Sequence, residues 1–532
     1  MKNRRWIPIA LTLGMMPVAC DSGTGPETGV ETLTIAAAGG TMIAGETMQL
    51  TLRLTDSKGN TATIQGDNWA SSDPFVASVA PDGLVTAHCG GVTTITATAQ
   101  EMVAQLDLIV GVPGEAAPSE VYLNWSPRVL DTSSPGPLML TVHTPASTPT
   151  PLVELAGTSG LSPMCRVGVH SYQVPLDPAR TLSGYSEGDL HQFVGYLHLG
   201  EGGDFRGNLF INVKDATVPE VLPSALSATA QHTGRVFNLQ HEELLLGGAL
   251  PPDVIQSFYQ RFPDDHDFIA VVEQVESFNN RSYRSVRNDT HGVGLPIFDH
   301  GTPYDSPARL QGIISFPIST FFDLGETAAS HEIGHRWINF LDYPPTAQGS
   351  PHWPISNLAR GLMGFNIPGT NVGGQFPFVL TEQADGSYLL TCEGAGKEYN
   401  DLDLYLMGLL PPDSVGENFV FSNQDQASAL TCGGTLQGPV HRFGAAEVIA
   451  VDGPRLPGWP ETQKEFSIAT IVLSAGRLLT ASEMAFFHHM AARGSATEEL
   501  RFTSGFASGM TKPFHLATGG RGTLKTLIGA AK

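Results

Sequence analysis

The stretch His331-Glu332-Ile333-Gly334-His335 determines the expected fold of the C-terminal half of this chain. Its two histidines are four residues apart, so on an α-helix their side chains lie one above the other on the same face. Apolar residues at helical spacing continue to Leu341, and Pro344-Pro345 then predicts the end of the helix. Asp323 and Glu326 have the spacing of a capping box at its start. The sequence therefore predicts one helix that carries both histidines.

Two histidines on one helix face can bind the same metal ion, and a glutamate beside them can hold the water molecule that the metal activates. His331, Glu332 and His335 form this H-E-x-x-H pattern, which resembles the motif of zinc metalloproteases. The resemblance implies Zn²⁺ as the cofactor, the two histidines as ligands and Glu332 as the general base. Gly334 within a helix costs about 1 kcal/mol relative to alanine, so we expect close packing or a cleft at this position.

The segments before the motif have the pattern of buried strands. Residues 268–272 are all apolar, residues 310–316 are largely apolar, and the second run comes shortly before the predicted helix. A strand followed by the metal-binding helix is the order expected of a zincin catalytic domain, in which an edge strand pairs with an extended substrate. We therefore predict an α+β zincin metallopeptidase domain over residues 219–532.

A catalytic zinc site needs three protein ligands and one open position, and the motif supplies two of them. No His-x-x-Gly-x-x-His continuation follows, so the metzincin pattern fails. Residues 399–409 indicate a short apolar helix carrying carboxylates. With the motif and His352-Trp353, this segment resembles exported bacterial zincin-like metalloproteases related to the gluzincins, in which a carboxylate on a downstream helix completes the site. The resemblance implies Asp403 as the third ligand, although gluzincins have glutamate there.

Other residues remain open for these roles. Glu398, Asp401 or His352 could be the third ligand instead of Asp403. Asp403 lies in an apolar run and is expected to be buried, where an aspartate needs a cation or a hydrogen-bond donor. His352 could also donate a proton to the tetrahedral intermediate, and Tyr405 could donate a hydrogen bond to the developing oxyanion. Both of these side chains could equally pack in the protein without a catalytic role.

The N-terminus has the pattern of an export signal. A basic start, residues 2–5, precedes the apolar segment 6–18, which is too short to span a membrane as a mature helix. Ala19-Cys20 then resembles the end of a bacterial lipoprotein signal, which implies Cys20 as the lipidated first residue of the mature chain. Ordinary cleavage near the same place would instead give a secreted protein. We predict a signal peptide over residues 1–20 and a linker over residues 21–29.

Residues 30–111 are predicted to form a small all-β domain. Short segments alternate polar and apolar residues with a period of two, and turn residues lie between them. The order of Trp69-Ala70-Ser71-Ser72-Asp73-Pro74, the strands at 76–79 and 83–87, and Gly90-Gly91 resembles the bacterial group 2 Ig-like domain. That resemblance implies a β-sandwich used as a spacer or adhesive module on surface proteins, with Trp69 in its core.

The remaining segments complete a multidomain fold class. Residues 112–120 are a linker, and residues 121–218 predict a second β-rich domain, either a β-sandwich or a pro-region. The chain is thus expected to contain an N-terminal all-β Ig-like sandwich, this second domain and the C-terminal α+β zincin domain. Cys392 and Cys432 are plausible disulfide partners, whereas Cys89 and Cys165 fall in different predicted domains and could be free thiols.

The formal net charge of −23 argues against nucleic acid or an anionic membrane surface as a partner. We predict an exported zinc-dependent endopeptidase, lipid-anchored in the cell envelope or otherwise secreted, which acts on protein or peptide substrates. One alternative is a surface adhesion or scaffold protein with an inactive zincin domain, and another is a zinc hydrolase of non-peptide bonds. The intact Glu332 argues against an inactive site, because such a site has no need of its base.

Overall fold

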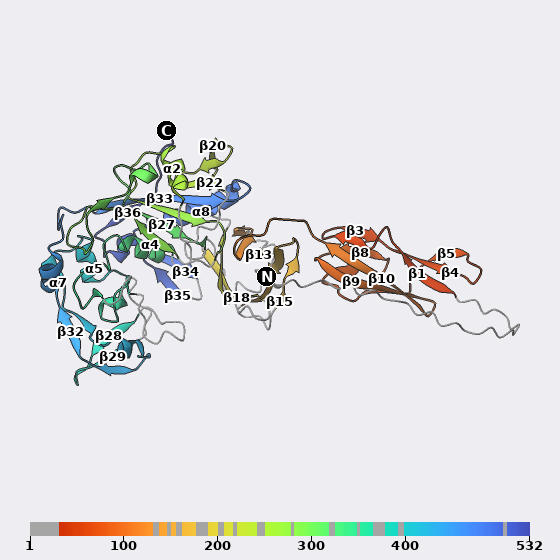
Figure 1. Cartoon of the computed structure of the whole chain (residues 1–532), viewed down its shortest axis with the longest axis horizontal. Helices are drawn as coiled ribbons and strands as arrows, with labels where there is room; N and C mark the ends of the chain where they lie inside the picture. Colours follow the sequence, from red (N-terminus) through yellow and green to blue (C-terminus); the bar gives the residue numbers. More distant parts are fainter. Residues whose placement is uncertain are drawn as a thin grey trace, which may run out of the picture. The chain divides into compact units, whose positions relative to one another are not determined.

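The computed structural model describes two compact units, Met1–Val112 and Pro113–Lys532 (Figure 1). The residues described are 31–130, 138–145, 151–155, 162–176, 190–199, 207–215, 221–241, 251–277, 281–318, 325–347, 352–364, 378–391, 398–503 and 508–532. Cys20 and the predicted export signal therefore lie outside the described residues. Among the helices of the described part, none combines the length and the apolar character needed to cross a membrane.

In its described residues, 31–112, the first unit consists of β-strands in three small sheets. Their orders are β1 (Thr32–Ala36), β4 (Thr51–Thr55), β5 (Thr61–Ile64); β2 (Thr41–Ile43), β10 (Met102–Gly111), β9 (Gly91–Ala99), β6 (Asn68–Ser71); and β3 (Thr47–Gln49), β8 (Leu84–Ala87), β7 (Ala77–Val79). Alternate residues of β9 are buried, as its sequence predicts. Trp69 packs against the core, and Gly83, with a φ of +83°, lies against its ring where a side chain would clash.

The second unit begins with two sheets that share a core with the rest of the unit. One sheet contains β11 (Tyr122–Ser126), β13 (Leu138–His143), β17 (Ser171–Leu176) and β16 (Cys165–Arg166). The other contains β12 (Val129–Leu130), β19 (Gly207–Asp215), β18 (Leu190–Leu199), β14 (Pro151–Leu155), β15 (Ser162–Pro163), and the C-terminal hairpin β34 (Leu500–Thr503) and β35 (Ser508–Thr511). Buried Leu123 and Trp125 belong to the same hydrophobic cluster as Phe316 and Ile333. The second β region therefore packs as part of the C-terminal unit.

The centre of this unit is an eight-stranded sheet. Its order is β20 (Ser224–Ser227), β21 (Ala230–His232), β22 (Val236–Gln240), β33 (Glu465–Ser474), β23 (Phe268–Glu273), β27 (Gly312–Phe316), β24 (Ser282–Ser285), and β36 (Thr523–Lys525) pairs with β33. Strands β22, β33, β23 and β27 are parallel. Every residue of β23 and β27 is buried, as is typical of parallel strands covered on both faces. The predicted strands at 268–272 and 310–316 are confirmed, with small shifts at their ends.

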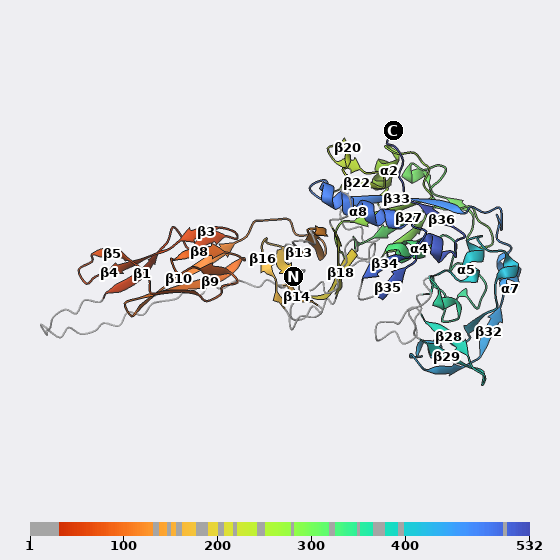
Figure 2. The ribbon, with the colours of Figure 1, turned by 180° about the vertical axis from the view of Figure 1, so that it is seen from behind.

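Helices pack against both faces of this sheet (Figure 2). Ile269 and Val271 of β23 pack with α2 (Pro252–Tyr259), whereas Phe268, Ala270 and Val272 pack in the cluster that includes α4 (Gly325–Gly334) and α8 (Ala481–Arg493). The other elements of the unit are β25 (Arg287–Asn288), β26 (Phe298–Asp299), η1 (Thr302–Tyr304), η3 (Leu358–Arg360), β28 (Val379–Glu382), β29 (Ser387–Thr391), α5 (Asp401–Leu406), η5 (Pro412–Ser414), β30 (Asn418–Phe421), α6 (Gln424–Ser428), β31 (Thr435–Gln437), β32 (Val440–Phe443), α7 (Ala445–Asp452) and α9 (Phe514–Ala517).

Two expectations require correction. The helix ends at Gly334 rather than near Leu341, because the chain then forms turns and Asn339 adopts a φ of +77°. The expected capping residue Asp323 lies outside the described residues. Cys89 and Cys165 are both disulfide-bonded, so the suggestion that they are free thiols is wrong. Cys432 is also disulfide-bonded, and its expected partner lies outside the described residues.

Candidate metal site

Helix α4 brings the first two predicted site residues into the interior of the second unit. His331 and Glu332 are 2% and 4% exposed, and His335 follows the last residue of the helix. Gly334 is required by packing, because a Cβ there would lie 2.4 Å from the sulfur of Met363 and 3.1 Å from the Tyr399 ring. The expected close packing at this glycine is therefore confirmed, and it outweighs the helix cost of glycine.

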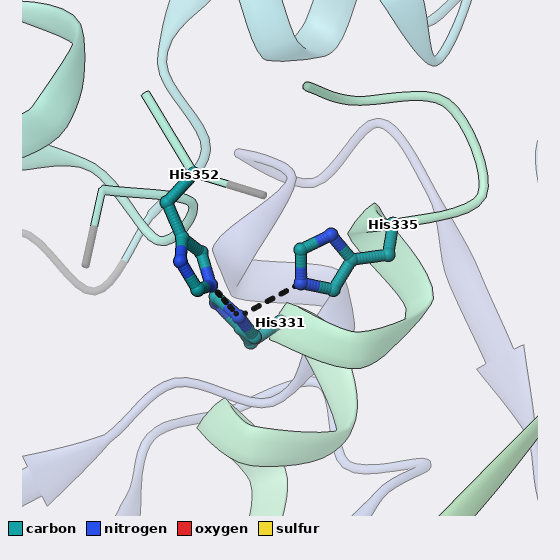
Figure 3. A group of neighbouring side chains, drawn as sticks. All are labelled: His331, His335 and His352. Carbon is teal, nitrogen blue, oxygen red and sulfur yellow. Dashed lines mark hydrogen bonds between the residues drawn. The ribbon is translucent and has the colours of Figure 1, made fainter. Parts of the chain in front are cut away.

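Three histidines converge at one point (Figure 3). The Nε2 atom of His331 lies 3.1 Å from Nε2 of His352 and 3.2 Å from Nε2 of His335. His352 lies on the loop before η3, so it approaches the helix from a separate segment. Among the described histidine, cysteine, aspartate and glutamate residues, these three are the group whose potential ligand atoms lie within 4.8 Å of one another.

The hydrogen bond of His331 fixes which of its nitrogens faces the cluster. Its Nδ1 donates to the carbonyl oxygen of Leu362 at 2.6 Å, which leaves Nε2 with a lone pair directed at the other two rings. Burial lowers the pKa of all three histidines, well below the usual value for His331, to about 3 for His335 and to about 4 for His352. The imidazoles are therefore neutral near pH 7, which is the form that binds metals.

The distances from His331 Nε2 to the other two ring nitrogens are close to those between ligands of a tetrahedral ion. Nitrogen ligands about 2.0–2.1 Å from zinc in a tetrahedral site are roughly 3.4 Å apart. The single ring-plane lone pair of His331 Nε2 accepts only one hydrogen bond well, yet two other ring nitrogens lie within 3.2 Å of it. A cation between the three nitrogens would satisfy all of them, so this donor set suits a zinc ion with one position open.

Glu332 is held by a charged partner. The Nε of Arg281 donates to Oε1 of Glu332 at 2.8 Å, and both side chains are largely buried. Burial raises the pKa of Glu332, and the Arg281 guanidinium opposes that shift. In the described part of the chain, no hydrogen bond is made to Oε2, so this oxygen remains open to accept a proton. The sequence contained no signal for Arg281, because it precedes edge strand β24 and belongs to no motif.

The structure does not place Asp403 with the histidines. Its carboxylate is fully buried, as expected, but Oδ1 accepts a hydrogen bond from the indole Nε1 of Trp353 at 2.7 Å. Oδ2 accepts from the backbone amide of Asn400 at 3.0 Å, in the capping box of α5. Burial raises the pKa of Asp403 to about 7, and these hydrogen bonds counteract the shift. The geometry thus replaces Asp403 by His352 as the third candidate ligand, and Asp403 instead anchors the residue next to His352.

The other predicted site residues have partners elsewhere. The Tyr405 hydroxyl accepts a hydrogen bond from the backbone amide of Arg455 at 3.1 Å, and its ring is buried. Tyr405 is therefore a core residue rather than a candidate donor to the oxyanion. Glu398 is paired with Lys512, and Asp401 is exposed in the first turn of α5. Neither carboxylate belongs to the histidine group.

One family model matches this chain, and its match lies within the first unit. Residues 30–110 match the model of the bacterial Ig-like domain (group 2). No curated protein matches the chain. Among solved structures, domains 5-6 of the S-layer protein SbsC are 16% identical, with a TM-score of 0.14, over 35% of this chain and all of that one. Domains 1-6 of the same protein are matched over only 29% of their length, at 16% identity, a TM-score of 0.13 and 37% of this chain.

The adhesin FdeC of Escherichia coli is 15% identical with a TM-score of 0.14, over 35% of this chain and 64% of that structure. TM-scores this low carry no information about activity. The chain is multidomain and strongly β-rich, and it contains a bacterial Ig-like domain over residues 30–110, which indicates a cell-surface or extracellular protein.

Proposed function

We propose that the second unit is a zinc-dependent hydrolase that cleaves protein or peptide substrates outside the cytoplasm. The observation that supports this most is the convergence of the ring nitrogens of His331, His335 and His352, with the buried Glu332 directly after His331 in the sequence. In this proposal the three histidines hold the ion. Cys20 carries the lipid anchor, and the Ig-like domain serves as a spacer module.

In this proposal each residue around the site has a different role in hydrolysis. Bound zinc would supply a Lewis acid that polarises the scissile carbonyl. Glu332 takes the proton of the attacking water on Oε2 and passes it to the leaving amine. Arg281 fixes the orientation of Glu332 through Oε1 and keeps a negative charge on a carboxylate whose burial favours the protonated form. The carbonyl of Leu362 keeps the Nδ1 proton of His331, so that Nε2 remains the ligand atom.

The test combines metal analysis with an assay on a general protein substrate. The chain without its signal peptide is purified, its metal content is measured, and hydrolysis of casein is followed before and after chelation. We expect about one zinc ion per chain, loss of hydrolysis with the chelator, and recovery when zinc is added. A chain that binds no zinc, or one whose hydrolysis is unchanged by chelation, contradicts the proposal. Ester and phosphoester substrates in parallel assays test the alternative of a zinc hydrolase of non-peptide bonds.

A second candidate function is surface adhesion or scaffolding with an inactive hydrolase domain. The match of residues 30–110 to a bacterial Ig-like domain favours it, and the comparisons favour it more than they favour an enzyme. In that case a chain with the change Glu332→Gln would bind its surface partner as well as the unchanged chain does. One measurement distinguishes the two candidate functions. Hydrolysis of casein, an ester or a phosphoester by the zinc-bound chain supports the hydrolase, and no hydrolysis of any of them supports adhesion or scaffolding.

A further inference from the structure

Two buried arginines line a small cavity in the second unit. Arg336, which directly follows His335, contributes one guanidinium group, and Arg455, which follows α7, contributes the other. The cavity volume is about 100 Å³, well below the roughly 300–1,000 Å³ of sites for organic ligands. Trp337 and Phe466 provide apolar walls. A cavity of this size has room for a small ion but not for a peptide or a nucleotide.

The first guanidinium has a charged partner. Arg336 is 0% exposed and donates to Oε1 of Gln311 at 3.0 Å, to Oδ1 of Asn288 at 2.7 Å and to Oδ1 of Asp289 at 2.8 Å. The carboxylate of Asp289 compensates the charge only in part, because its side chain is 69% exposed and therefore solvated. Each terminal nitrogen of Arg336 donates one of these bonds, so further N–H groups remain for a ligand.

The second guanidinium has only neutral acceptors. Arg455 is 6% exposed and donates to the carbonyl oxygens of Leu406, Met407 and Pro457 and to Oγ1 of Thr462 at 2.7 Å. Within the residues that the structure describes, no carboxylate forms an ion pair with it. Burial lowers its pKa to about 10, and the charge of Arg336 acts in the same direction. Two buried cations thus share one exposed anion, which leaves an uncompensated positive charge beside the cavity.

We propose that this arginine cavity binds one small oxyanion, such as phosphate or a carboxylate, between the guanidinium groups of Arg336 and Arg455. Arg336 keeps one N–H group on each terminal nitrogen, and Arg455 keeps one N–H group in all. An oxyanion accepts several charge-assisted hydrogen bonds through separate oxygen atoms, which distinguishes it from a halide. The net charge of the two arginines and Asp289 is +1, from two positive groups and one negative group, and one anionic charge neutralises it. The inference is independent of zinc binding and of hydrolysis.

Thermal unfolding of the full chain in inorganic phosphate tests this inference. Sodium chloride at matched ionic strength is the reference, and acetate replaces phosphate in a parallel series. A ligand bound by the folded state raises the midpoint in a saturable way, by roughly 2 °C or more at concentrations well above its dissociation constant. We expect this rise with the oxyanions and not with chloride. An equal rise in all three salts, or one that increases without saturation, overturns the inference.

Two variants assign the effect to the cavity. Arg455→Gln should abolish the saturable rise, whereas Arg442→Gln, at an exposed arginine paired with Glu382 and Glu417, should retain it. Should Arg455→Gln fail to fold, Thr462→Asp decides, because it places a carboxylate next to Arg455. That chain should unfold at a higher temperature without phosphate and no longer respond to it. A response to phosphate that is unchanged in Thr462→Asp contradicts the inference.

Discussion

The Ig-like domain is built from strands that can be predicted from neighbouring residues, whereas the metal-site region brings together residues that lie far apart in the sequence. In the Ig-like domain, β9 and β10 pair as antiparallel neighbours, and alternate residues of β9 are buried in the core. In the metal-site region, His331 lies in α4 and His335 directly follows that helix. His352 lies on a separate loop, and Arg281 precedes the edge strand β24. Local periodicity is therefore enough to predict the first region, whereas the second also depends on contacts that periodicity does not encode.

The largest expected effect concerns the base. Glu332→Gln should reduce hydrolysis by roughly 10²–10⁴-fold, because the amide cannot take the proton from water. Zinc content should not change, because Glu332 is not among the three converging ligand groups. Turnover is measured on casein together with metal content. Glu398→Gln, at a carboxylate paired with Lys512, is the matched control and should leave turnover unchanged. Comparable turnover in Glu332→Gln would exclude the proposed mechanism.

The next effect tests the ligand that the sequence left open. His352→Ala should weaken zinc binding by more than roughly 100-fold. The loss of a residue that only hydrogen-bonds to a metal ligand typically weakens binding by roughly 10–100-fold. The reason for the larger effect is that two histidines leave the ion without its third protein ligand. Zinc affinity is measured by competition with a chromophoric chelator. Full zinc affinity in this variant would contradict the proposed ligand set.

A smaller effect is expected at Asp403. Asp403→Ala removes the acceptor of the Trp353 indole and of the Asn400 amide, and should destabilise the fold by about 1–3 kcal/mol because both buried hydrogen bonds are lost. Since Trp353 is next to His352, zinc affinity should fall by roughly 10–100-fold, less than in His352→Ala. Denaturant unfolding and chelator competition measure the two quantities. If Asp403→Ala loses zinc as completely as His352→Ala, the original assignment of Asp403 as a ligand is restored.

The outcome at Asp403 shows where the sequence argument was sound and where it stopped. Its apolar surroundings correctly predicted full burial, and burial required a cation or a donor. The sequence could not distinguish between the two, and the structure supplies a donor, the Trp353 indole. The end of α4 was mispredicted for a related reason. Pro344-Pro345 predicted where the helix would end, but α4 already ends at Gly334. The chain turns there, and the buried Arg336 donates hydrogen bonds to Gln311 and Asn288.

A further test concerns the partner of Glu332. Arg281→Ala should lower kcat by roughly 10-fold with zinc still bound, because the carboxylate loses the donor that orients it. Arg281→Lys should recover part of this loss, since an ammonium can donate to the same oxygen. A purely structural role would instead lower thermal stability in both variants and leave kcat per folded chain unchanged. Steady-state kinetics with zinc content as the reference distinguish these outcomes.

The smallest effect on the site is expected from the first unit, and it tests whether the two regions are independent. Ile95 is fully buried in the core of the Ig-like domain, so Ile95→Ala should lower its unfolding free energy by about 2–5 kcal/mol through the cavity it leaves. Zinc affinity and turnover should not change, because every group assigned to the metal site belongs to the second unit.

The matched change Ile314→Ala, in β27 just before the metal-site helix, should lower both stability and zinc affinity. Calorimetry and chelator competition on the two variants provide the comparison. Lost turnover in Ile95→Ala at a temperature where the Ig-like domain alone has unfolded would show that the site depends on that domain.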